Sequence, residues 1–186
     1  MIRIAVTNRK LCIGNFSERL NLLAASSYYH AIVLREKDLT EAEYLKLAEK
    51  VKSICLKYDK PLILHQFVSV AIKLKTPVHL PLSILESLQE SEKEKFLKIG
   101  TSVHSLDELK RAEKAGATYC FAGHIFETDC KKNIPGRGIS FLKTIIQNAE
   151  IPVYAIGGIH RENEFLIKEA NASGACFMSS CMQETI

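Results

Sequence analysis

Two pairs of small residues near the end of the sequence have the composition of an anion-binding site. Gly157-Gly158 follows the apolar run 152–156, and Ser179-Ser180 follows the apolar run 175–178. Paired glycines let a phosphate approach backbone N–H groups closely, and the first residues of a helix supply further donors. A tight turn with two ordinary capping serines is the alternative interpretation. We predict that these four residues hold a phosphate group.

His124 is the candidate for proton transfer. It follows Gly123, directly after the apolar run 119–122, so its imidazole can reach the end of a strand. An imidazole has an ordinary pKa near 6.5 and can both remove and return a proton at neutral pH. A loop histidine packed over the strand ends is the alternative, because the polar residues that follow also suit a solvated loop.

The other five histidines carry weaker signals. His30 and His79 lie within or against apolar runs and are expected to be structural, whereas His104 suits either a cavity wall or the cap of the next helix. His65 has no assigned role. The chain has no H-E-x-x-H pattern, no acidic cluster and no zinc-type spacing, so we expect neither a metal nor a cofactor.

Eight short apolar runs alternate with helix-period segments along the chain. Each run is rich in Ile, Val, Leu or Ala and is uniformly apolar, which is typical of a parallel strand covered on both faces. The runs are 2–6, 31–34, 61–64, 77–80, 96–101, 119–122, 152–156 and 175–178.

Strands that alternate with helices indicate a parallel α/β architecture, either a doubly wound sheet or a barrel. Eight strands without a break in composition favour one (β/α)8 TIM-barrel domain over residues 1–186. The barrel is short, because this fold usually takes ~250 residues, and residues 179–186 suit only a truncated last helix. In a barrel the functional residues follow the carboxyl ends of the strands, which is where His124 and both small-residue pairs are expected.

Three helices have strong sequence signals. The segment 40–58 begins with Thr40 and Glu43, which form a capping box, and its apolar residues recur every three or four positions. The segment from Ser105 to Gly116 also begins with a hydroxyl and has a glutamate three residues later. The third helix is expected at 139–149.

The composition excludes several classes of protein. The 186 residues are 47% hydrophobic and 25% charged, unlike disordered or fibrous chains. No uncharged apolar run approaches the ~18 residues of a membrane span, and the first residues do not resemble a signal peptide. Six cysteines without a C-x-x-C pair are expected to be free thiols in a reducing compartment. We therefore expect a cytoplasmic protein that binds no membrane and, with a net charge of +4 and no basic stripe, no nucleic acid.

Four segments together resemble one known family. They are LREKD at 34–38, GTSVHSL at 100–106, GHIFETDCK at 123–131 and PVYAIGGI at 152–159. In this order they resemble thiamine phosphate synthase and its TenI-type relatives over nearly the whole chain. The resemblance implies a TIM barrel that binds a small-molecule thiazole phosphate in thiamine biosynthesis.

Within this family, the residues after the third and fourth strands separate two activities. A synthase is expected to carry an Asn-Asp and a Gly-Gln-Asp-type segment there, which hold magnesium and a pyrophosphate, whereas this chain has His65-Gln66 and Leu80-Pro81. Magnesium requires hard oxygen ligands, usually including one or two carboxylates. His124 stands where the family usually has proline, and in this feature the chain is similar to the thiazole tautomerases, in which the corresponding histidine is catalytic.

The similarity to tautomerases implies a cofactor-independent isomerase. His124 would transfer the proton that converts a carboxylated dihydrothiazole-ylidene ethyl phosphate into the aromatic carboxythiazole ethyl phosphate. The implied substrate-binding residues are Arg35, Lys37 and Ser102, facing the carboxylate or the space that pyrophosphate occupies in a synthase, Thr128 and Lys131 over the thiazole ring, and Gly157, Gly158, Ser179 and Ser180 around the phosphate.

Two other functions stay open. The chain could instead be a thiamine phosphate synthase, or a non-catalytic barrel that binds thiazole phosphate and regulates thiamine genes, since a fold does not determine a function. The sequence also leaves open whether the chain forms a homo-oligomer.

Overall fold

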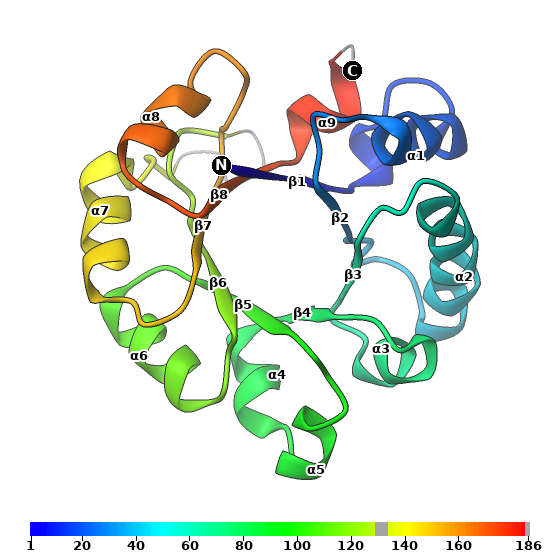
Figure 1. Ribbon diagram of the computed structural model, residues 1–186, viewed down its shortest axis with the longest axis horizontal. Helices are drawn as coiled ribbons and strands as arrows, with labels where there is room; N and C mark the ends of the chain where they lie inside the picture. Colours follow the sequence, from blue (N-terminus) through cyan, green and yellow to red (C-terminus); the bar gives the residue numbers. More distant parts are fainter. Residues whose placement is uncertain (129–133, 185–186) are drawn as a thin grey trace.

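Eight parallel strands close into a barrel in the computed structural model, which describes residues 1–128 and 134–184 (Figure 1). The strands pair in chain order, and the barrel closes between the last and the first, where Cys176 lies opposite Ile4. They are β1 (Ile2–Val6), β2 (Ala31–Leu34), β3 (Leu62–His65), β4 (Val78–Leu80), β5 (Ile99–Val103), β6 (Tyr119–Gly123), β7 (Val153–Ile156) and β8 (Gly174–Phe177). The predicted (β/α)8 barrel is confirmed, and the doubly wound alternative is wrong.

The fifth strand differs most from its prediction. The apolar run 96–101 predicts a strand there, but β5 begins at Ile99, and Leu97 is 89% exposed in the turn that precedes it. β5 also continues past the run, because Ser102 and Val103 pair with Phe121 and Ala122 of β6. Polar residues at the end of a strand interrupt its apolar pattern, so the pattern does not predict that these residues belong to the strand.

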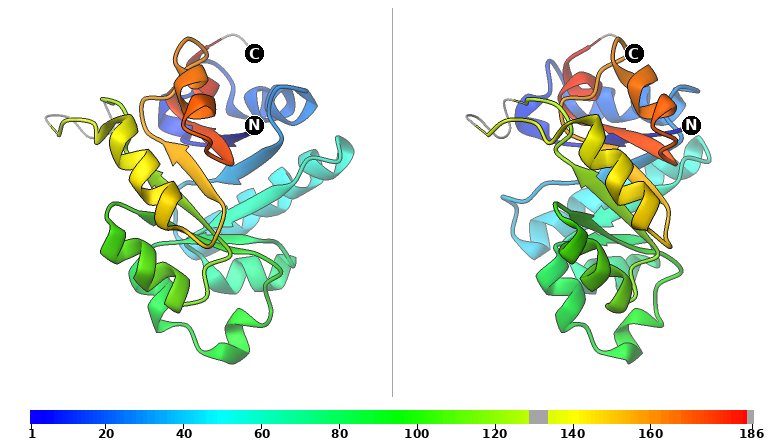
Figure 2. Two further views of the ribbon diagram at one scale, coloured as in Figure 1. Left: turned by 60° about the vertical axis from the view of Figure 1, so that its left-hand side comes forward. Right: turned by 90° about the vertical axis from the view of Figure 1, so that its left-hand side faces the viewer.

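Helices cover the outside of the barrel on all sides (Figures 1 and 2). They are η1 (Arg9–Leu11), α1 (Phe16–Ala25), α2 (Glu41–Lys57), α3 (Val68–Leu74), α4 (Leu82–Ser87), α5 (Glu90–Lys93), α6 (Leu106–Lys114), α7 (Gly138–Asn148), α8 (Glu164–Glu169) and α9 (Ser179–Gln183). The predicted capping box of α2 is present, since Glu43 N–H bonds the Thr40 hydroxyl and the Glu43 carboxylate accepts from Thr40 N–H at 2.9 Å. After β8 the chain forms the short α9, in agreement with the predicted truncated last helix.

Two apolar layers hold the barrel together. One lies between the strands and the helices, and the other fills the barrel with the side chains of Ile4, Val6, Ala31, Val33, Tyr119, Phe121 and Cys176. The inner layer also holds an imidazole, because the ring of His79 stacks on that of Phe121 with 4.0 Å between centroids. The barrel is therefore a packed core, and a ligand can enter only at an end of it.

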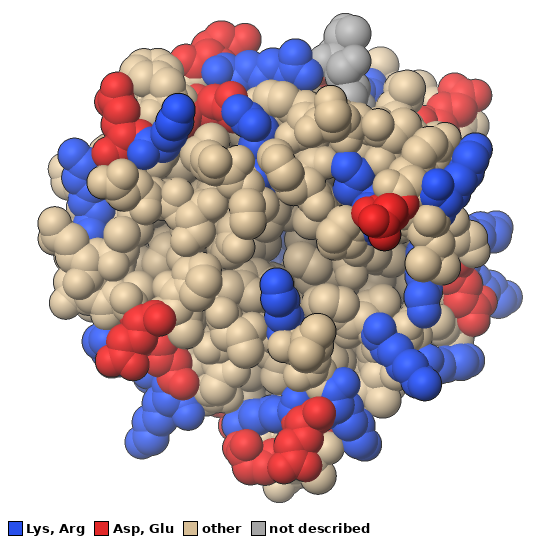
Figure 3. Space-filling model, in the orientation of Figure 1, with Lys and Arg blue, Asp and Glu red and all other residues tan. Residues whose placement is uncertain are grey.

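The surface shows no single-sign patch on the face drawn in Figure 3. Basic and acidic side chains alternate around the edge of that face, and its centre is largely uncharged. No helix among the described residues is both long and apolar enough to cross a membrane. The five described cysteines are free thiols, as predicted, and Cys130 lies outside the described residues.

Candidate active site

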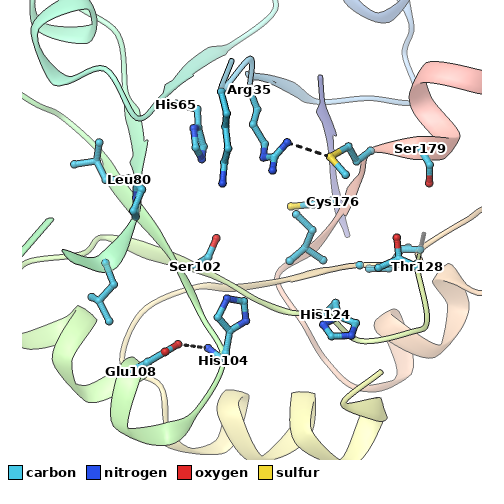
Figure 4. A pocket seen from close by; sticks show the side chains of 18 of the residues that line it. Arg35, His65, Leu80, Ser102, His104, Glu108, His124, Thr128, Cys176 and Ser179 are labelled. Carbon is cyan, nitrogen blue, oxygen red and sulfur yellow. Dashed lines mark hydrogen bonds between the residues drawn. The ribbon is translucent and has the colours of Figure 1, made fainter. Parts of the chain in front are cut away.

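A cavity of about 530 Å³ opens at the carboxyl ends of the strands. Its walls come from the ends of β2 to β8 and the loops that follow them (Figure 4). The lining residues are Arg35, Lys37, His65, Leu80, Pro81, Leu82, Ser83, Ser102, His104, Glu108, Arg111, His124, Thr128, Ile156, Gly157, Gly158, Ile159, Cys176, Met178 and Ser179. The barrel therefore brings together eight of the predicted site residues from five different segments, namely Arg35, Lys37, Ser102, His124, Thr128, Gly157, Gly158 and Ser179.

His124 is held in place by the path of its own loop. After β6 the loop continues along the end of β7, where Ile125 N–H bonds Ile156 O at 2.9 Å and Phe126 N–H bonds Gly157 O at 3.0 Å. The loop returns at Arg137, whose N–H bonds His124 O at 3.0 Å. His124 is only 5% exposed and lines the cavity.

The hydrogen bonds of His124 determine which ring nitrogen is available. Nε2 lies 3.2 Å from the carbonyl oxygen of Ile134, which can only accept, so Nε2 carries the hydrogen. In the neutral ring Nδ1 then has the lone pair. Nδ1 is buried, and it is the one buried polar side-chain atom of the cavity wall without a hydrogen-bond partner in the described part of the chain. A buried acceptor without a partner is costly, and a ligand proton at this point would relieve the cost.

The glycine pair lies directly against His124. Gly157 and Gly158 have φ angles of +103° and +64°, which L side chains rarely adopt. A Cβ on Gly157 would lie 2.3 Å from the Cβ of His124, and one on Gly158 would lie 2.3 Å from the carbonyl oxygen of Glu127. Both glycines are therefore needed for the close approach of the loop after β6 to the end of β7.

The predicted phosphate-binding residues are only partly brought together. Gly157, Gly158 and Ser179 line the cavity, but Ser180 does not. The hydroxyl of Ser180 is buried and donates to Ile159 O at 3.2 Å, so its side chain supports the loop after β7 instead of facing a ligand. The pair of serines begins α9, and successive residues of a helix face different directions, which explains why only one of them faces the cavity.

Four further predicted residues follow β2 and β6. Arg35 and Lys37 line the cavity, and the Arg35 N–H donates to the hydroxyl of Thr7 at 3.0 Å. The Arg35 guanidinium also contacts the sulfur of Met178 at 3.8 Å, as Figure 4 shows. Thr128 lines the cavity, whereas Lys131 lies outside the described residues.

Two histidines support the cavity floor from inside the barrel. His79 is 2% exposed, and its Nε2 lies 3.0 Å from the hydroxyl of Ser102, while its Nδ1 lies 3.4 Å from the hydroxyl of Tyr119. The ring of His65 stacks on that of His79 at 5.9 Å. The expectation that His79 is structural fits its burial, and its contact with Ser102 shows that it also orients a cavity hydroxyl. The sequence pattern does not predict this contact, because 22 intervening residues separate His79 from Ser102.

Both histidines are uncharged in the folded protein. Burial lowers the pKa of His65 to about 2, with the neighbouring His79, Arg35 and Lys37 adding to the effect. Burial also lowers the pKa of His79 to about 3, assisted by the charges of Arg35 and Lys37. A neutral imidazole donates one hydrogen bond and accepts one, and the hydroxyls of Ser102 and Tyr119 can serve in either role.

Acid is expected to destabilise the fold through these two residues. In the unfolded chain each histidine binds a proton near pH 6.5, whereas in the folded protein it does so only near pH 2 or 3. The stabilisation is thus fully present above pH 6.5 and is lost as the pH falls towards 3, by about 1.4 kcal/mol per pH unit for each histidine. Urea denaturation of His79→Gln between pH 7 and about pH 4 should show a slope reduced by about that amount. An unchanged slope would contradict the burial of a neutral His79.

His104 lines the cavity, which is one of the two roles that its sequence position allows, and Ser105 caps the next helix instead. The backbone N–H of His104 donates to the carboxylate of Glu108 at 2.5 Å. The hydroxyl of Ser105 caps α6 by accepting from Glu108 N–H at 3.1 Å. The carboxylate of Glu108 therefore accepts from the backbone of His104 instead of from that of Ser105, which a capping box would require. This contact fixes the segment that carries His104.

The donor set of the described part of the cavity wall does not fit magnesium. Glu108 is the one carboxylate among the described residues of the wall, and it is bonded to His104. Glu36 is buried and accepts from the hydroxyl of Thr7 at 2.7 Å and from Arg9. Across residues 1–128 and 134–184, no three His, Cys, Asp or Glu side chains are grouped to hold a metal ion. Magnesium prefers oxygen ligands with carboxylates among them, and these walls offer imidazole, hydroxyl and apolar groups instead.

Comparisons with known proteins agree with the barrel and its cavity. A family described as thiamine monophosphate synthase, TMP-TENI, matches residues 4–181. The thiamine-phosphate synthase of Fusobacterium nucleatum is 32% identical over 182 residues, which cover 96% of this chain and 88% of that protein. The putative thiamine-phosphate synthase 2 of Aquifex aeolicus is 35% identical over 173 residues, or 92% of this chain and 90% of that one.

A solved structure also matches nearly the whole chain. The thiamine phosphate pyrophosphorylase from Pyrococcus furiosus superposes with a TM-score of 0.82 at 29% identity, over 98% of this chain and 88% of that chain. Sequence and fold thus match over nearly the whole length, and the chain belongs to the thiamine monophosphate synthase (TMP-TENI) family.

Proposed function

We propose that the protein is a thiazole tautomerase that converts a carboxylated dihydrothiazole-ylidene ethyl phosphate into carboxythiazole ethyl phosphate. The observation that carries the proposal is His124, which lines the cavity and has a buried Nδ1 without a hydrogen-bond partner, while the described residues of the cavity wall offer no ligand set for magnesium. A proton transfer needs a positioned acid or base and no metal, so these walls suit it.

The chemistry needs one proton to leave a ring carbon and one to arrive at the exocyclic carbon. The ring proton lies next to the carboxylate and within a conjugated system, so its removal leaves a delocalised anion. Nδ1 of His124 is the proton acceptor, because Nε2 is already bonded to Ile134 O. Protonation of the exocyclic carbon then gives the aromatic ring, and the number of atoms and electrons in the substrate is unchanged.

The charged groups of the cavity fit a substrate with two anionic ends. Gly157, Gly158 and Ser179 offer backbone and hydroxyl donors to the phosphate. Arg35 and Lys37 bring positive charge to the carboxylate, for which a planar guanidinium is geometrically suited. Thr128 borders the space that remains for the ring.

A proton NMR time course with the ylidene phosphate tests the proposal. The aromatic product should form faster in the presence of the protein than without it. A non-catalytic thiazole-phosphate regulator would instead bind the ligand, detected by calorimetry, with no increase in rate. That result would overturn the proposal.

Thiamine phosphate synthase is the second candidate, and the names of the relatives from Fusobacterium nucleatum and Aquifex aeolicus favour it. It differs in its need for magnesium and in releasing pyrophosphate from a pyrimidine pyrophosphate.

We expect chelation by EDTA to leave the tautomerisation rate unchanged. The physical reason is that Glu108 alone among the described wall residues supplies a carboxylate, and its contact is to the backbone of His104. The parallel assay supplies magnesium with the pyrimidine and thiazole phosphates and measures pyrophosphate. Release of pyrophosphate that EDTA abolishes and magnesium restores would favour the synthase.

A further inference from the structure

His104 is a second histidine at the cavity to which the proposed reaction gives no role. It follows β5, while His124 follows the neighbouring β6, and Figure 4 shows both side chains on one side of the cavity. The two strands are paired up to Val103 and Ala122, so the residues that follow them stay close. The cavity wall includes both rings.

The contacts of His104 fix its tautomer. Its Nδ1 lies 2.6 Å from the carbonyl oxygen of Gly123, which is a hydrogen-bond acceptor only. Nδ1 therefore carries a hydrogen whether the ring is neutral or charged. Any proton that His104 exchanges must leave from or arrive at Nε2.

The two rings thus use opposite nitrogens for their hydrogen bonds to backbone carbonyls. His124 donates from Nε2, which leaves Nδ1 without a hydrogen-bond partner, whereas His104 donates from Nδ1, which leaves Nε2 as its exchangeable position. Both backbones are held, His104 by the carboxylate of Glu108 and His124 by Arg137 N–H. Two fixed groups with one exchangeable position each can act on two different carbons of one ligand.

We propose, on the basis of the tautomerase function above, that His104 is a second catalytic residue, which protonates the exocyclic carbon. His124 Nδ1 takes the ring proton and becomes an imidazolium. The Nε2–H of protonated His104 gives its proton to the exocyclic carbon, a C–H bond forms there, and His104 becomes neutral. Exchange with water resets both rings after the product leaves, so the proton balance is closed.

Isotope transfer distinguishes two histidines from one. With substrate deuterated at the ring carbon and turned over in ordinary water, a single histidine that shuttles the proton carries deuterium to the exocyclic carbon. Two histidines deliver a solvent proton there instead. We expect product without deuterium at the exocyclic carbon, by NMR and mass spectrometry, and an appreciable deuterium content would overturn the proposal.

Two substitutions separate a catalytic role from a positioning role. In His104→Asn the side-chain amide can still donate to Gly123 O, because it reaches about as far as Nδ1, but it cannot transfer a proton. In His104→Gln the amide reaches towards the position of Nε2 and gives up the bond to Gly123. Both variants should form product ~10²-fold more slowly, with little change in KM. His104→Asn turning over at close to the parent rate would show that the residue only positions Gly123, which would overturn the proposal.

Ring-proton exchange supplies the readout that a structural role would not produce. In heavy water, His104→Asn should still exchange the ring proton of the substrate through His124 while product formation is slow. A parallel loss of exchange and product formation would count against the proposal. His30→Asn makes the same chemical change at an exposed residue before β2, at the other end of the barrel, and should match the parent.

Failure of this inference differs from failure of the proposed function. A parent protein that forms no aromatic product lacks the tautomerase activity, and the role of His104 falls with it. If the parent protein is active and His104→Asn is equally active, the tautomerase function stands and only the catalytic role of His104 is contradicted.

Discussion

His124→Asn is expected to lower the rate of tautomerisation by ~10²-fold or more, which corresponds to about 2.7 kcal/mol of activation free energy. An asparagine side chain occupies a similar volume and forms hydrogen bonds, but it cannot accept a proton at neutral pH. The measurement is kcat from the NMR time course. Binding of the aromatic product, measured by calorimetry, should change little, because Gly157, Gly158 and Ser179 provide the contacts to the phosphate in this proposal.

His124→Gln is the matched control for packing. Its amide is long enough to replace Nε2 as the donor to Ile134 O, so it restores the hydrogen bond that the ring makes there without restoring a base. A general base predicts that both variants are slow. A packing histidine predicts a lower free energy of unfolding for the asparagine variant and near-normal turnover for the glutamine variant. A folded variant within about threefold of the parent rate would contradict the role of His124 as base.

The fold was predictable because its signals are local. A parallel strand in a barrel is covered on both faces, so β1 and β2 appear in the sequence as the apolar runs 2–6, interrupted by Arg3, and 31–34, with the same bounds. The capping box of α2 is equally local, since Thr40 and Glu43 bond each other across one turn. Where strand residues are polar, as in Ser102 of β5, the local signal fails and the bounds shift.

The position of a cavity residue was predictable where the residue lies at the end of a strand. It was not predictable where contacts with residues distant in the sequence determine which way the side chain points. His124, Ser102 and Gly157 lie at strand ends, and the barrel brings them to one cavity. Ser180 stands next to a cavity residue in the sequence, yet its hydroxyl bonds Ile159 O, a contact over 21 residues. The support of Ser102 by His79 and of His104 by Gly123 likewise depends on strand pairing, which sequence patterns do not encode at the level of single atoms.

Gly157→Ala is expected to destabilise the fold by about 3 kcal/mol or more, the largest effect on stability among the changes considered. Two costs combine at this residue. Its φ of +103° is unfavourable for an alanine, and the new Cβ would overlap the Cβ of His124 at 2.3 Å and its Cα at 2.7 Å. The overlap is with backbone and the first side-chain atom, which no rotamer change relieves. Urea denaturation measures the difference in free energy of unfolding.

Gly14→Ala separates these two costs. Gly14 also has a positive φ, +83°, but an added Cβ there would meet no atom within 4 Å. It should therefore show only the backbone cost, about 1 kcal/mol. If Gly157→Ala costs no more than Gly14→Ala, then the loop after β6 does not lie against β7 as closely as these distances require.

The same substitution also tests whether the glycine and the histidine act together. The alanine methyl can be accommodated only if the His124 segment moves, and a displacement of about 1 Å is enough to slow a positioned proton transfer ~10²-fold. Folded Gly157→Ala should therefore lose turnover, whereas Gly14→Ala should not. Normal turnover in folded Gly157→Ala would mean that the loop tolerates the shift and that the base is not held by this contact. In the proposed tautomerase, Gly157 would therefore serve both binding and catalysis, because it borders the predicted phosphate site and only a glycine leaves room for His124.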